Sequence, residues 1–95
     1  MSDPSLLVLA SLITGEKHGY AIMEDIRRFA GVRLGPGTLY GAITRLQDRG
    51  WIRAVETEAR RKPYRITAEG RHHLEEQMTA LERVVKTAMQ RLRRA

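Results

Sequence analysis

The chain of 95 residues contains no cysteine, so it can form neither a disulfide framework nor a thiolate metal site. Aromatic residues are scarce, with one Trp, three Tyr and one Phe. The longest apolar run, Leu6 to Ala10, is far too short to span a bilayer, and nothing near the N-terminus resembles a signal peptide. We therefore expect a cytoplasmic protein with no membrane contact.

Positive charge is present in excess, and it is unevenly distributed. The net charge is +6. Residues 1–59 balance seven Lys or Arg against seven Asp or Glu, whereas residues 60–95 hold ten against four. Two basic clusters stand out: Arg60, Arg61, Lys62 and Arg65, then Arg91, Arg93 and Arg94. A local basic patch is typical of a protein that binds a polyanion such as nucleic acid, although a solvated surface has the same composition.

Two helices are predicted in the first third of the chain. Asp3-Pro4 is a helix start, with Asp as the cap and Pro in the first turn. A second helix opens near His18-Gly19 and closes at Gly31. Its apolar residues recur at helical spacing, which predicts one buried face made of Ile22, Ile26 and Phe29.

A third helix follows the Gly35-Pro36-Gly37 segment and ends at Gly50, with Gly37 or Thr38 as its cap. Its apolar face is narrow and consists of Leu39, Ile43 and Leu46. The opposite face is therefore exposed, and it carries Thr38, Gly41, Thr44, Arg45 and Asp48.

The pattern then alternates with a period of two, which predicts strands over residues 51–56 and 64–67 joined by a basic link. Thr67 caps a final helix that runs to about Arg93, and Gly70 in its first turn is a costly residue that suits close packing. The predicted fold is mostly α (α+β): a winged helix-turn-helix over residues 1–67, followed by a long helix over 68–95.

This layout predicts a protein that binds double-stranded DNA. The third helix is of the size that enters the major groove, where Thr44 and Arg45 can reach base edges and Arg is the usual partner of guanine. Its glycines, Gly41 among them, permit close approach, and Thr38 lies at its start. The cationic tip of the hairpin, with Arg60, Arg61 and Lys62, is suited to phosphates.

The final helix has an apolar seam with a mean period of 3.5 residues, as in a coiled coil. The seam residues are Leu74, Met78, Leu81, Val85, Ala88 (or Met89) and Leu92. A second copy of the chain would cover such a seam, so we expect a homodimer that binds two half-sites about one helical turn apart. This helix is the predicted dimerisation element.

No catalytic constellation or phosphate-loop motif is present, so we do not expect an enzyme or a cofactor. His18, His72 and His73 are interpreted as surface histidines, because no third ligand at metal-site spacing accompanies the last two. The alternative function is a winged helix that binds a protein or RNA. The shortage of aromatic residues and the basic hairpin favour DNA over both.

The chain also resembles the PadR family of bacterial transcriptional regulators. The matching segments are His18-Gly19-Tyr20, Leu34-Gly35-Pro36-Gly37-Thr38-Leu39-Tyr40, Arg45-Leu46, Gly50-Trp51-Ile52, Arg61-Lys62-Pro63-Tyr64-Arg65-Ile66-Thr67 and Gly70. The single helix after the hairpin resembles the short branch of that family. Trp51 departs from it, because an aliphatic residue is usual there.

The resemblance implies a repressor that binds an operator as a dimer and is commonly released by a small-molecule effector. It also implies that Tyr40 belongs to the DNA-facing set. The final helix lacks the aromatic residues that would line a drug pocket at the dimer interface.

Overall fold

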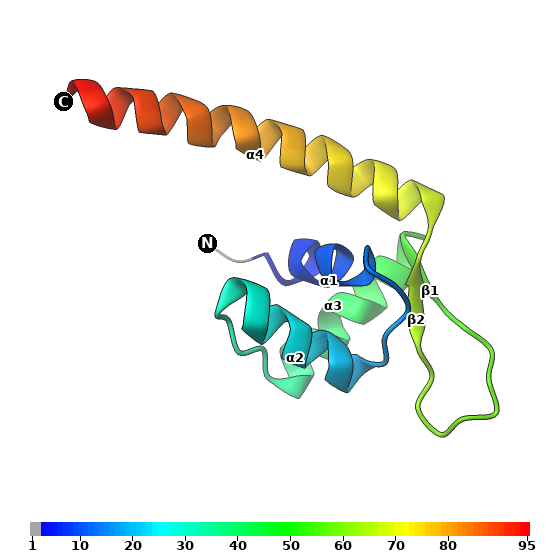
Figure 1. Cartoon of the computed structure of the whole chain (residues 1–95). Helices are drawn as coiled ribbons and strands as arrows, with labels where there is room; N and C mark the ends of the chain where they lie inside the picture. The colour runs from blue at the N-terminus through cyan, green and yellow to red at the C-terminus, as the bar shows by residue number, and fades with distance from the viewer. Residues whose placement is uncertain (1–2) are drawn as a thin grey trace.

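The computed structural model describes residues 3–95 and has four helices and one two-stranded sheet (Figure 1). The order is α1 (Pro4–Leu12), α2 (Gly19–Ala30), α3 (Pro36–Asp48), β1 (Ile52–Ala54), β2 (Tyr64–Ile66) and α4 (Ala68–Arg94). The strands are antiparallel and pair Ile52 with Ile66 and Ala54 with Tyr64. The predicted winged helix layout is confirmed, with strands shorter than expected.

Side-chain caps begin three of the four helices. Asp3 accepts a hydrogen bond from the Ser5 N–H at 2.9 Å, and Thr67 accepts one from the Gly70 N–H at 3.0 Å. His18, expected at the surface, instead caps α2 through Nδ1, which accepts from the Ala21 N–H at 3.3 Å. The helix α3 starts earlier than expected, because Pro36 occupies its first turn and its fixed φ suits that position.

The core forms where α1 lies against α2, α3 and the start of α4. Its members are apolar and almost fully buried: Val8, Leu9, Leu12, Ile22, Ile26, Leu39, Ala42, Ile43, Leu46, Ile52 and Leu74. The prediction that Phe29 continues the buried face of α2 is wrong, since this side chain is 50% exposed. It lies in the last turn of α2, where residues 27–30 are all exposed.

The hairpin is anchored to the loop between α1 and α2. The Tyr64 N–H donates to the Lys17 carbonyl oxygen at 2.9 Å, and the Lys17 N–H donates to Tyr64 O at 3.3 Å. Arg65 Nε donates to Glu16 Oε2 at 2.8 Å. We call residues 55–63, which link the strands, the wing loop; its ends are joined by the Val55 N–H donating to Pro63 O at 2.9 Å. The base of the hairpin is therefore fixed while the loop projects away from α4 (Figure 1).

The first turn of α4 is held tightly against Trp51, the residue before β1. The Thr67 N–H donates to Trp51 O at 3.0 Å, and a Cβ on Gly70 would lie 2.8 Å from the carbonyl carbon of Trp51. The expected close packing at Gly70 is confirmed. Beyond this region α4 leaves the domain, and every residue from Glu82 onward is exposed.

Trp51 packs against the core and also stacks on a histidine. Its ring lies parallel to that of His73 with centroids 3.7 Å apart, and the Arg49 guanidinium lies 5.2 Å from the Trp51 ring. His73 is therefore half-buried rather than a surface histidine, whereas His72 is exposed and lies 3.6 Å from Glu76. Within residues 3–95, no helix is long and apolar enough to cross a membrane.

Candidate nucleic-acid interface

The exposed face of α3 is held outward by the burial of its other face. Leu39, Ile43 and Leu46 are almost fully buried, and they fix the rotation of the helix about its axis. The predicted DNA-facing residues lie on the free side: Thr38, Tyr40, Thr44 and Arg45 are exposed, and Gly41 is half-buried. A helix presented in this way can enter a groove without distorting the core.

The wing loop carries three free positive charges. Arg60, Arg61 and Lys62 are all exposed, and none of them forms an ion pair with a carboxylate among the described residues. Arg65, which belongs to the same cluster in the sequence, differs because it pairs with Glu16. The electrostatic contribution of the wing to binding an anion therefore comes from three charges rather than four.

A polar pocket of about 370 Å³ joins the wing loop to the helices. Three elements contribute to its lining: the start of α2, one residue of α3 and the hairpin. The lining residues are His18, Gly19, Tyr20, Tyr40, Arg60, Arg61, Lys62 and Tyr64. The pocket thus combines cations, phenol groups and the amide end of a helix, all of which donate hydrogen bonds to anions.

Tyr40 is seated in this pocket by Gly19. A Cβ at residue 19 would lie 2.7 Å from Cζ of Tyr40, so any larger residue there would push the phenol ring out of its present position. Burial raises the pKa of the Tyr64 phenol above its usual value, and the neighbouring Tyr40 phenol raises it further. Tyr64 is therefore a neutral hydrogen-bond donor at physiological pH.

No role in DNA binding was predicted from the sequence for the residues at the start of α2. His18 caps the helix, Gly19 seats Tyr40, and Tyr20 lines the pocket with a side chain that is 58% exposed. In the sequence, the His-Gly-Tyr segment could have indicated this site. An aromatic residue so close to a helix cap is not needed for the core. These residues meet Tyr40 only because α2 packs against α3.

The predicted seam of α4 divides into two parts. Leu74 is only 6% exposed and belongs to the core of its own chain, so it offers little surface to a second copy. Leu81 is half-buried, whereas Met78, Val85, Ala88 and Leu92 are exposed. The available apolar surface therefore begins near Met78.

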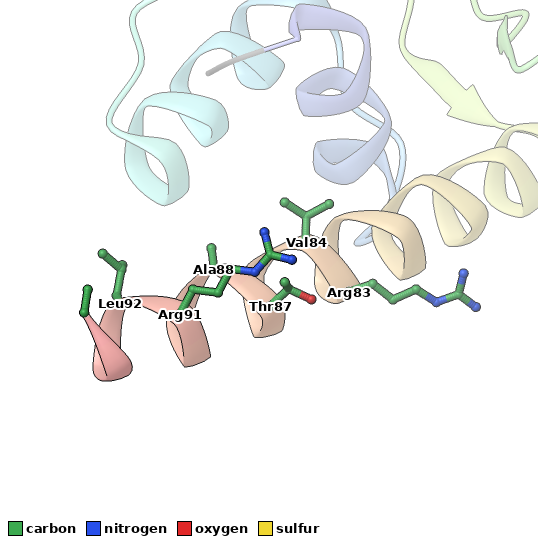
Figure 2. Close-up of a pocket in the computed structure, with 7 residues that line it drawn as sticks. Arg83, Val84, Thr87, Ala88, Arg91 and Leu92 are labelled. Carbon is green, nitrogen blue, oxygen red and sulfur yellow. The ribbon is translucent and has the colours of Figure 1, made fainter.

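The exposed part of α4 is also wider than the predicted seam. Val84, which the seam did not include, and Met89, the alternative to Ala88, are exposed beside it. Figure 2 shows Val84, Ala88 and Leu92 projecting to the same side of the helix, where they form an open apolar surface. We call Met78, Leu81, Val84, Val85, Ala88, Met89 and Leu92 the distal α4 face.

Three packed helices, an antiparallel hairpin and a following long helix define a winged helix-turn-helix protein. The sequence profile of the Transcriptional regulator PadR-like family matches residues 8–76. The chain belongs to this family, whose members are transcriptional regulators and not enzymes.

Individual relatives agree with this assignment. The chain is 41% identical over 83 residues to an uncharacterized 37.1 kDa protein in a Streptomyces fradiae transposon, covering 87% of this chain and 24% of that protein. It is 35% identical over 88 residues to the Mycobacterium tuberculosis transcriptional regulator Rv3488, covering 88% and 80%. A PadR family regulator from Clostridium difficile matches the structure with a TM-score of 0.84 at 26% identity, covering 94% and 97%.

Proposed function

We propose that this protein is a sequence-specific repressor that binds an inverted-repeat operator as a homodimer. In this arrangement α3 enters the major groove and the wing loop contacts phosphates. The observation that carries the proposal is the combination of an outward-facing α3 with three unpaired wing cations beside it. The chain spans only a quarter of the length of the Streptomyces relative, so the proposal concerns the segment described above.

Arg45 is the residue that we propose for base reading. It is exposed on α3 and makes no ion pair among residues 3–95, so its five N–H donors are available. A guanidinium group makes a bidentate contact to guanine O6 and N7, which discriminates against other bases by about 1–3 kcal/mol. Thr38, Gly41 and Thr44 would lie against the same stretch of groove.

Arg60, Arg61 and Lys62 are proposed to bind phosphate together with Tyr40. The polar pocket between the wing loop and the start of α2 supports this role, because a phosphate there would meet cations, phenols and backbone amides. Such contacts set affinity and register without reading sequence. They would therefore act equally on specific and random DNA.

The distal α4 face supports the homodimer. Val85 is 58% exposed and Leu92 is 70% exposed, and both lie on one apolar side of a helix that leaves its own domain. Packing this side against the same helix of a second copy would bury both surfaces around a two-fold axis. Residues 1–67 would then bind DNA, and the helix from residue 68 onward would set the spacing of two half-sites about 34 Å apart.

The decisive experiment is a fluorescence-anisotropy titration of the full chain against a site enriched from random duplexes, with unselected duplex as the control. We expect the selected site to bind at least about a thousandfold more tightly. Arg45→Ala should remove most of this preference while keeping affinity for unselected DNA. Equal and weak binding to both duplexes would contradict the proposal and would favour a protein- or RNA-binding role.

The direction of regulation needs its own assay. The chain is 40% identical over 65 residues to the transcriptional activator GvpE of Haloferax mediterranei, covering 68% of this chain and 33% of that protein. We expect repression when the selected site overlaps a reporter promoter, and stimulation of transcription would contradict it. The small-molecule effector implied by the resemblance stays a prediction.

A further inference from the structure

The side chain of Thr44 is held so that its methyl group is the part available to a partner. Its hydroxyl donates a hydrogen bond to the Tyr40 carbonyl oxygen at 2.9 Å, one helical turn back. A hydroxyl in this position lies against the helix backbone, because the carbonyl points along the helix axis. Thr44 is exposed, so its methyl group faces outward at the surface of α3.

Next to Thr44, at Gly41, no side chain projects from the surface of α3. Gly41 precedes Thr44 by three residues, and a Cβ at that position would meet only the Arg45 guanidinium at an ordinary distance of 3.5 Å. Gly41 has no positive φ, and an interior helical glycine costs about 1 kcal/mol relative to alanine. Contacts within the chain therefore do not account for this glycine, unlike Gly19 and Gly70, where a Cβ would collide with a neighbour.

We propose that Thr44 is a specificity residue that selects thymine through contact between its methyl group and the thymine 5-methyl group. Among the four bases only thymine presents a methyl group in the major groove, and threonine methyl groups are suited to contact it. Gly41 allows the base pair to approach the helix backbone, and the Arg45 guanidinium lies beside this contact. The inference rests on the proposed binding of DNA through α3.

The first test replaces each thymine of the selected site in turn by deoxyuridine, which differs only by the missing methyl group. We expect one position in each half-site where this change weakens binding by about fourfold, the value of one buried methyl group. Thr44→Ser should bind the thymine site about fourfold more weakly and should no longer distinguish deoxyuridine. Thr44→Val, which keeps a methyl group and loses the hydroxyl, should retain the distinction.

These outcomes separate the inference from the proposed function. If the wild-type chain selects a site but deoxyuridine is tolerated at every position, thymine reading is refuted and DNA binding stands. If Thr44→Ser remains as sensitive to deoxyuridine as the wild type, another residue contacts the methyl group and the assignment to Thr44 is refuted. If no duplex of any sequence binds, both proposals fail.

A second variant, Gly41→Ala, tests the close approach with two readouts of opposite sign. The melting temperature should rise by about 4 °C or more, because alanine favours the helix and the new Cβ fits. Affinity for the selected site should fall about tenfold, since the added methyl group would separate α3 from the base pair. A more stable protein with unchanged affinity would refute the close approach.

Discussion

Gly70→Ala should destabilise the protein even though alanine is the better helix former. The added Cβ would lie 2.8 Å from the carbonyl carbon of Trp51 and 3.1 Å from Ile66 Cγ1. Overpacking of this kind costs about 1–3 kcal/mol, and a backbone obstacle favours the upper value because it cannot rotate away. Subtracting about 1 kcal/mol for the gain in helix propensity leaves a net loss of about 2 kcal/mol.

For a domain of this size that loss lowers the melting temperature by about 8–16 °C. The assay is thermal unfolding followed by circular dichroism at one fixed protein concentration, since dimerisation makes the melting temperature depend on concentration. The matched control is Gly41→Ala, for which a rise is expected. A Gly70→Ala variant as stable as the wild type would refute this prediction, because it would mean that the first turn of α4 does not lie this close to the backbone of Trp51.

Three further predictions concern the wing, the distal α4 face and Tyr64. Replacing Arg60, Arg61 and Lys62 by Gln should weaken binding to any duplex and reduce the slope of log affinity against log salt by about 2.7. The control is Arg65→Gln, which should leave the slope nearly unchanged because the charge of Arg65 is already paired. Val85→Asp should yield monomers in sedimentation experiments. The control Thr79→Asp, at an exposed position outside the distal α4 face, should remain dimeric. A dimer of Val85→Asp would place the interface elsewhere. Because the folded state raises the pKa of Tyr64, its contribution to the free energy of unfolding is complete below pH 10 and is lost as pH rises through the folded pKa. Tyr64→Phe should flatten this alkaline decline in urea titrations, and an unchanged decline would assign it to other groups.

The periodicity of the sequence predicted well the direction that side chains face. It predicted less well whether a neighbouring element covers them. In α3 the predicted direction and the predicted burial were both right, since Leu39 and Ile43 point inward and are buried. In α2, Phe29 lies on the same side as Ile22 yet is half exposed, because no neighbouring element covers the last turn. Helical spacing reports an angle about the axis, whereas burial also depends on how far the neighbouring element extends.

The same distinction applies to α4. Leu74 and Val85 belong to one heptad pattern, and the sequence treats them as equivalent. Leu74 is covered by its own domain because Gly70 lets the first turn of α4 lie against the backbone of Trp51, while Val85 lies beyond the reach of that domain. A pattern can predict that a surface will be covered, but the identity of the partner depends on the tertiary structure.

Glycine illustrates how structure divides residues that look alike in sequence. Gly31 and Gly50 have φ values of +67° and +75° and end helices, a role that their position after an apolar face predicts. Gly19 and Gly70 lie in the first turns of α2 and α4, close to the Tyr40 ring and to the backbone of Trp51. Gly41 lies in the interior of α3, and no contact within the described chain requires it. Since helical glycine is costly, the proposed close approach of a DNA base pair to the exposed face of α3 would account for Gly41.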